Sequence, residues 1–166
     1  MTTPMLQALT DENREELLTR TLEILDRGGL VCLPTETVYG IGGRSDMPEV
    51  EARLREFKGE RGAKPFSLHC ADADQVFALG ERSPAAQRLS DAFWPGPLTL
   101  VLARKDGPGT LAFRVVDQDF TTEVLRRGEG PLLPSPAHKR GGGPPTTAQR
   151  AGKAAGRGWQ RIRAAG

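Results

Sequence analysis

Short apolar runs alternate with segments of helical periodicity along most of this chain, and this alternation limits the fold more than any other feature. The runs 30–34, 65–71, 98–103 and 111–116 are typical of buried strands. Apolar residues recur at helical spacing between them, in 47–57, 74–79, 84–93 and 120–127, and before them in a helix expected to begin within 10–13 and to end at the glycines 28 and 29. Strands interleaved with helices predict an α/β fold with a twisted, mixed parallel and antiparallel sheet flanked by helices.

Glycine and proline mark where these elements end. Residues 94–97 (Trp-Pro-Gly-Pro) must end a helix, in which Ala86, Leu89 and Phe93 are expected to face inward. Residues 106–109 separate two strand-like runs and predict a hairpin. Residues 40–43 (Gly-Ile-Gly-Gly) are expected to form a glycine-rich turn after a buried strand.

The charge is unevenly distributed. The chain has 23 basic and 21 acidic residues, and residues 131–166 hold seven basic residues but no Asp or Glu. Residues 1–130 therefore hold 16 basic and 21 acidic residues, a net charge of −5. From this shift we predict a mildly acidic domain over 1–130, followed by a basic, Gly/Pro/Ala-rich tail over 131–166 that is weakly ordered.

The two cysteines are too few for a disulfide framework, and no apolar run approaches the length that spans a bilayer. We therefore expect a cytoplasmic protein that does not enter a membrane. Cys32 and Cys70 each lie in an apolar run, where cysteine is usually a small buried residue. No residue is assigned as a nucleophile.

Three segments carry candidate binding residues. In the first, 34–40, the hydroxyls of Thr35, Thr37 and Tyr39 could orient a small polar ligand where a strand enters the glycine-rich stretch. An ordinary strand with threonines on its solvent face explains this segment equally well.

In the second segment, 58–64, Lys58, Arg61 and Lys64 accompany two glycines, which suits a triphosphate. The pattern is not a Walker A loop, and a solvated charged loop is the alternative. His69 follows on a predicted strand, where histidine is more often structural than catalytic. The third segment, 93–100, is a rigid kink that enters a strand, and by itself it indicates only a tightly specified backbone position. Arg114 lies in the later apolar run 111–116, and it points either to solvent or into a pocket for an anion such as a carboxylate.

Together these stretches resemble the YrdC-like threonylcarbamoyl-AMP synthase family. Residues 33–42 resemble its P-T-[DE]-T-V-Y-G-[LI]-G signature, and 58–69 its K-G-R-P-x-x-K-P-x-x-x-H segment. Residues 93–102 resemble F-W-P-G-P-L-T-L-V-L, and 110–114 the strand that supplies an arginine. The resemblance covers roughly residues 10–130.

The resemblance implies a sheet around a deep, positively charged cleft. It also implies synthesis of threonylcarbamoyl-AMP and pyrophosphate from L-threonine, bicarbonate and ATP, with Mg²⁺ assisting and with tRNA reached directly or through a threonylcarbamoyl-transferase partner. No metal ligands are assigned. The residues that would bind L-threonine are Thr35, Thr37, Tyr39, His69 and Arg114. Those that would bind ATP are Lys58, Arg61, Lys64, Thr110 and Ser135.

The chain departs from the family pattern in two places. Glu60 stands where the pattern has arginine, and Arg61 is the candidate to replace it. Residues 134–141 stand where the pattern has S-A-N-x-S-G, and only Ser135 matches one of its serines. Two further hypotheses therefore stay open: an RNA-binding protein of this fold without synthase activity, and an inactive, truncated remnant.

Overall fold

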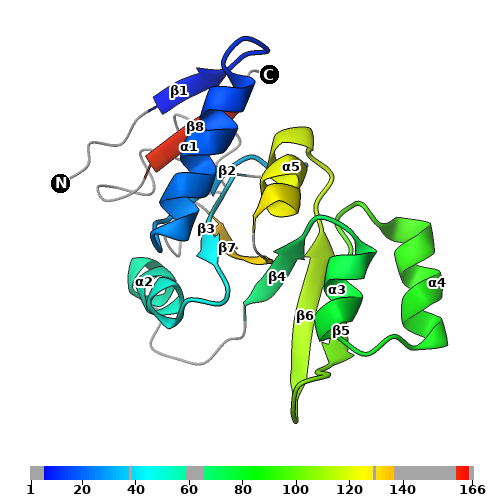
Figure 1. The fold of residues 1–166 in the computed structure, drawn as a ribbon. Coiled ribbons are helices and arrows are strands. Elements are labelled where there is room, and N and C mark those ends of the chain that lie inside the picture. The colour runs from blue at the N-terminus through cyan, green and yellow to red at the C-terminus, as the bar shows by residue number, and fades with distance from the viewer. Residues whose placement is uncertain (1–5, 38, 59–65, 129, 137–159, 165–166) are drawn as a thin grey trace.

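The computed structural model describes residues 6–37, 39–58, 66–128, 130–136 and 160–164. Within them, eight strands form one sheet in the order β1-β8-β2-β3-β7-β4-β6-β5 (Figure 1). In chain order their bounds are β1 Leu6–Leu9, β2 Val31–Leu33, β3 Gly40–Arg44, β4 Ser67–Cys70, β5 Leu100–Ala103, β6 Thr110–Val115, β7 Leu132–Pro136 and β8 Gln160–Ala164.

The sheet is mixed, as the alternation of elements predicted. β8 runs parallel to both β1 and β2, and β4 runs parallel to β6. The other pairs, β2–β3, β3–β7, β4–β7 and β5–β6, are antiparallel. The β5–β6 pair confirms the predicted hairpin.

Five helices, counted over the part of the chain that the structure describes, cover the two faces of the sheet. Their bounds are α1 Arg14–Asp26, α2 Pro48–Lys58, α3 Ala73–Leu79, α4 Pro84–Phe93 and α5 Asp119–Arg127. One buried apolar cluster joins α1 and α5 to residues such as Val31 and Leu132. A second joins α2, α3 and α4 to the neighbouring strand residues Cys32 and Leu133. Since consecutive strand residues point to opposite faces, the two clusters lie on opposite sides of the sheet.

The predicted glycine-rich turn at residues 40–43 is wrong, because these residues form β3 and pair with both β2 and β7. The glycines allow close packing rather than a turn. A Cβ atom on Gly42 would lie 2.7 Å from the carbonyl oxygen of Leu133, and one on Gly43 would lie 2.5 Å from a methyl of Val50. The chain instead changes direction between the end of β2 and the start of β3.

The orientation predicted for α4 is partly wrong. Ala86 is buried, but the partner that shares its face is Ser90, while Leu89 and Phe93 are 39% and 57% exposed. The pairs 86/90 and 89/93 have the same helical spacing, so periodicity alone does not choose between the two stripes. The helix ends at Phe93, before residues 94–97, as predicted.

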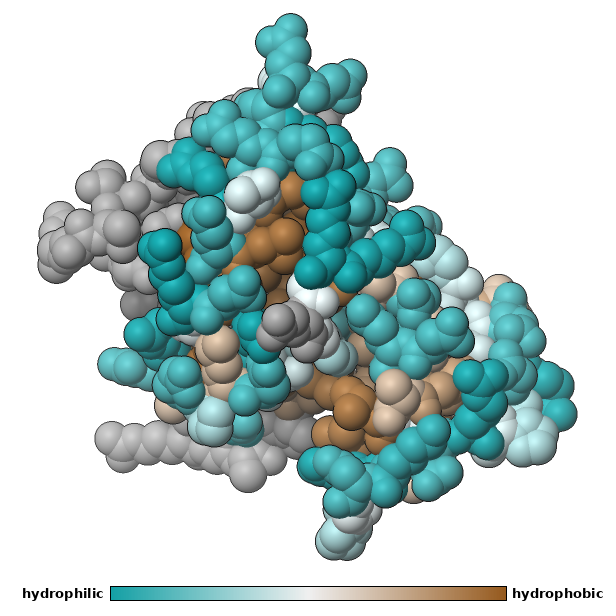
Figure 2. Space-filling view, viewed as in Figure 1, coloured by the Kyte–Doolittle hydropathy of each residue, from teal (hydrophilic) through white to brown (hydrophobic). Residues whose placement is uncertain are grey.

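Two strands come from residues beyond 130, and the sequence pattern did not predict either of them. β7 lies between β3 and β4, and β8 lies between β1 and β2. Residues 137–159 of the predicted tail lie outside the described residues. The described helices are all too short or too polar to cross a membrane. The face seen in Figure 2 is largely hydrophilic, with hydrophobic residues visible in the gaps between hydrophilic ones.

Candidate functional site

The segment between β2 and β3 meets the end of β6 at Arg114. Nη2 of Arg114 donates a hydrogen bond to Oε1 of Glu36 and lies 3.5 Å from Oγ1 of Thr37. The hydroxyl of Thr37 is in turn 3.1 Å from that of Thr35. These contacts join residues that are almost 80 positions apart in the chain. The structure therefore brings together three of the five residues expected to bind L-threonine.

His69 is the fourth member of this group. It lies directly opposite Arg114 in the parallel β4–β6 pair, and only 8% of it is exposed. Burial and the nearby guanidinium of Arg114 lower the pKa of His69 to about 4, although Glu36 opposes them. The imidazole is therefore neutral at pH 7, and it offers one hydrogen-bond donor and one acceptor rather than a second positive charge.

A small hollow of about 20 Å³ lies beside His69, with Thr35 and Thr121 among its lining residues. This volume holds about one water molecule. The hydroxyl of Thr121 donates a 2.6 Å hydrogen bond to the carbonyl of Pro34, which ties α5 to the segment that carries Thr35. The position of the two threonines thus depends on the packing of α5.

The fifth expected residue, Tyr39, is not part of this group. Its side chain packs against the apolar cluster on the side of α2 and α3, which includes Cys32 and Ile41. Tyr39 therefore contributes to the core next to β3, and its predicted role at the ligand is untested.

The residues expected to bind ATP are only partly described. Thr110 is exposed at the start of β6 and shares a face with Arg114, about 13 Å away at the usual rise of a strand. Lys58 is the last residue of α2, and Ser135 pairs with Ile41 in the β3–β7 ladder. Nothing is described of the side chains of Lys58 and Ser135, and Arg61 and Lys64 lie outside the described residues.

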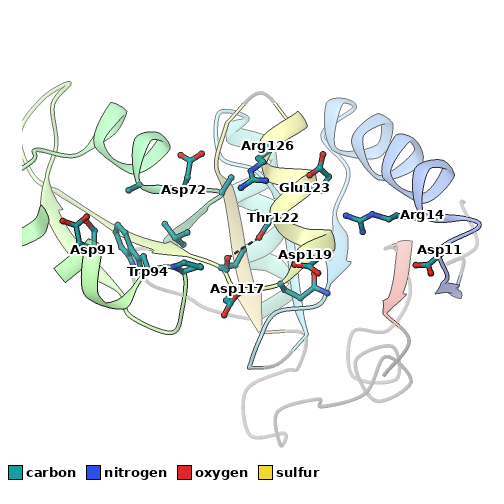
Figure 3. A pocket seen from close by; sticks show the side chains of 17 residues that line it. Asp11, Arg14, Asp72, Asp91, Trp94, Asp117, Asp119, Thr122, Glu123 and Arg126 are labelled. Carbon is teal, nitrogen blue, oxygen red and sulfur yellow. Dashed lines mark hydrogen bonds between the residues drawn. The ribbon is translucent and has the colours of Figure 1, made fainter. Parts of the chain in front are cut away.

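A larger cavity, of about 850 Å³, lies at the carboxyl ends of β4 and β6 (Figure 3). Six carboxylates and two guanidinium groups line it, from Asp11, Asp72, Asp91, Asp117, Asp119, Glu123, Arg14 and Arg126. The net charge of this lining is therefore negative, whereas the resemblance implies a positively charged cleft. The backbone N–H of Asp117 donates to Oε2 of Glu36, so the cavity adjoins the Arg114 site.

Three groups at this site were not singled out from the sequence: Glu36, Thr121 and the backbone of Asp117. Burial raises the pKa of Glu36, but the hydrogen bonds from Arg114 and from backbone N–H groups outweigh it and hold that pKa below its usual value. Glu36 is therefore ionised at neutral pH. Its place between Thr35 and Thr37 was a signal, because a carboxylate in a candidate binding segment is a natural partner for an arginine such as Arg114.

Neither cysteine takes part in this group. Both are buried and neither forms a disulfide bond, and burial, with a smaller contribution from Asp72, raises the pKa of Cys70 to about 12. This confirms that they are core residues. Within the described residues, no group of three His, Cys, Asp or Glu side chains is placed to hold a metal ion.

The mixed sheet, with this site on the neighbouring strands β4 and β6, defines the chain as an α/β protein of the Sua5 type. It superposes on the crystal structure of Pyrococcus abyssi Sua5 complexed with L-threonine with a TM-score of 0.86 and 28% identity, over 98% of this chain and 50% of that one. Residues 23–162 match the sequence model of the Sua5/YciO/YrdC family, which carries the description "Telomere recombination". The chain belongs to this family.

Two curated relatives carry the name threonylcarbamoyl-AMP synthase. The protein from Pyrococcus abyssi is 34% identical over 130 residues, which are 73% of this chain and 38% of the relative. The protein from Bacillus subtilis strain 168 is 30% identical over 153 residues, which are 85% of this chain and 44% of the relative. The chain spans less than half the length of either relative.

Proposed function

We propose that this chain binds L-threonine at Arg114 and takes part in the ATP-dependent synthesis of threonylcarbamoyl-AMP. The observation that carries the proposal is the convergence of Thr35, Thr37, His69 and Arg114 on one side of the sheet. A guanidinium suits the carboxylate of an amino acid, and two hydroxyls suit its side-chain hydroxyl. The names of the relatives and the bound L-threonine of the P. abyssi structure support the same substrate.

In the proposed reaction, the amine of L-threonine adds to bicarbonate and gives a carbamate and water. A carbamate oxygen then attacks the α-phosphorus of ATP and displaces pyrophosphate. No side chain acts as a nucleophile, so the protein contributes position and neutralisation of phosphate charge. The neutral imidazole of His69 can accept a hydrogen bond from the amine without adding positive charge beside Arg114.

We assign ATP to the side of the site where β6 begins. Thr110 lies on the same face as Arg114, about 13 Å from it, a separation that a nucleotide joined to threonine can span. Lys58, Arg61, Lys64 and Ser135 complete the proposed nucleotide contacts, and Mg²⁺ would enter with the triphosphate. The product would serve modification of tRNA in the cytoplasm, through a transferase partner or directly.

The test is pyrophosphate release from the purified chain with L-threonine, bicarbonate and ATP, leaving out one component at a time. Release that requires all three supports the proposal. Release that is independent of L-threonine, or tRNA binding without any turnover, would argue against it. Since Glu60 replaces an arginine of the family pattern, Glu60→Arg is a useful companion variant, expected to raise the apparent affinity for ATP.

A further inference from the structure

Arg114, the proposed carboxylate-binding residue, already has a carboxylate partner within the chain. Nη2 of Arg114 donates to Oε1 of Glu36, and the two side chains are only 16% and 17% exposed. The other oxygen of Glu36 accepts the backbone N–H of Asp117 at 3.2 Å. Glu36 therefore spans two donors, one on the guanidinium and one at the end of β6.

This arrangement leaves Arg114 incompletely paired. Its Nε is buried and has no hydrogen-bond partner, and it is the one side-chain nitrogen or oxygen of the described residues in that state. Nε and Nη2 form one edge of the guanidinium, and a carboxylate that approaches this edge can accept from both. Glu36 accepts from Nη2 alone, because its second oxygen is held by Asp117.

Other ion pairs in the same structure show the complete arrangement. Arg44 and Arg104 each donate from Nε and from Nη2 to the two oxygens of the aspartate two positions further along the chain. Those pairs join neighbouring residues at the surface. The Glu36–Arg114 pair joins distant segments at the candidate site, and among the described residues it is the pair that leaves a buried donor without an acceptor.

We propose that Glu36 is an internal competitor for the carboxylate of an amino-acid ligand. In the unliganded protein, Glu36 neutralises Arg114. An incoming carboxylate accepts from both Nε and Nη2, displaces Glu36 from the guanidinium, and leaves it on the N–H of Asp117. This inference rests on the proposed function, because it takes the ligand at Arg114 to carry a carboxylate.

The expected consequence of this competition is that the site discriminates between L-threonine and simple anions. A simple anion gains only the contact with Arg114 and must compete with a carboxylate that is already in place. L-Threonine gains further contacts through its hydroxyl and amine, from the threonines at 35 and 37 and from His69. Glu36 therefore favours a ligand that bears several matching groups over acetate, phosphate or other small anions.

The experiment compares the wild-type chain with Glu36→Gln by calorimetric titration. Glutamine has the same shape, and its amide oxygen keeps the bond from Asp117, but it lacks the charge that neutralises Arg114. We expect Glu36→Gln to bind L-threonine about fivefold more tightly, as for the loss of one competing hydrogen bond to Arg114. Its affinity for L-threoninamide, which has no carboxylate, and for ATP should be unchanged.

Glu15→Gln is the matched control. Glu15 pairs with Arg127 at the exposed contact of α1 with α5, so its loss removes one paired carboxylate away from the site. We expect no change in L-threonine affinity. Unchanged or weaker binding of L-threonine by Glu36→Gln would overturn the inference, since Glu36 would then be a neutral neighbour or a support for Arg114.

A titration with acetate tests the competitor role of Glu36 independently of the proposed binding of L-threonine. The Nε–H resonance of Arg114, followed by NMR, should shift on adding acetate to Glu36→Gln at concentrations that leave the wild type unchanged. If acetate behaves in this way while L-threonine binds neither protein, Glu36 is a competitor and the proposed substrate is wrong. If L-threonine binds the wild type but neither ligand distinguishes the two proteins, the substrate stands and the competitor role is refuted.

Discussion

Replacing Arg114 with alanine tests the assignment on which the proposed function depends. The guanidinium lies at the meeting point of Glu36, Thr37 and His69, and about five-sixths of its side chain is buried. A hydrogen bond to a charged group contributes roughly 1.5–3 kcal/mol. The dissociation constant of L-threonine should therefore rise roughly 10- to 150-fold, while that of ATP changes less than about threefold.

The assay is calorimetric titration of each ligand separately, on protein whose thermal unfolding is recorded in parallel. Arg114→Ala alone leaves the largely buried carboxylate of Glu36 without its partner, which destabilises the fold. The double variant Arg114→Ala/Glu36→Gln removes both charges and serves as the control for folding. Equal losses of affinity for L-threonine and ATP, or no loss for L-threonine in a folded variant, would refute the assignment of Arg114 to the carboxylate.

Three further predictions concern the buried residues around the site. Because the pKa of His69 falls from 6.5 to about 4 on folding, its contribution to stability is present above pH 6.5 and is lost as the pH falls towards 4. In urea titrations, the free energy of unfolding of the wild type should fall by roughly 3 kcal/mol more than that of His69→Asn between pH 7 and pH 4. An equal fall in both proteins would contradict the burial of a neutral imidazole. Gly42→Ala places a Cβ atom 2.7 Å from the carbonyl oxygen of Leu133 and should lower the free energy of unfolding by about 1–3 kcal/mol, as measured by denaturant titration; an unchanged midpoint would show that β3 and β7 can separate. With its pKa raised to about 12, Cys70 should resist alkylation by iodoacetamide at pH 8 in the native protein and react in urea, as mass spectrometry of the labelled peptide would show.

Much of the fold could be predicted from local patterns. The helices α2, α3 and α5, the strand β2 and the β5–β6 hairpin lie within a few residues of their predicted positions. Periodicity and turn residues are local signals, and these elements follow them. Periodicity gave the wrong buried face for α4, because two sets of residues on this helix have the same spacing. The turn rule was wrong at Gly42 and Gly43, because these glycines allow close packing rather than a turn.

The candidate site can likewise be divided into features that the sequence predicted and features that it did not. The motifs at residues 33–42, 58–69 and 93–102 were enough to predict the family to which the chain belongs. The resemblance then implied an amino-acid site that includes Thr35, Thr37, His69 and Arg114. The sequence by itself thus determined the class of protein and named the groups that are proposed to contact a ligand. Those conclusions depend only on which residues occur, and in what order.

Only the tertiary structure decided how these groups are paired. The parallel β4–β6 pair sets His69 opposite Arg114, and the segment between β2 and β3 brings Glu36 onto the guanidinium from 78 positions away. Strand order and such contacts depend on the packing of both apolar clusters at once, which no local window contains. For that reason the sequence left open whether Arg114 faces solvent or an anion such as a carboxylate, and the fold revealed that the protein already supplies a carboxylate to it.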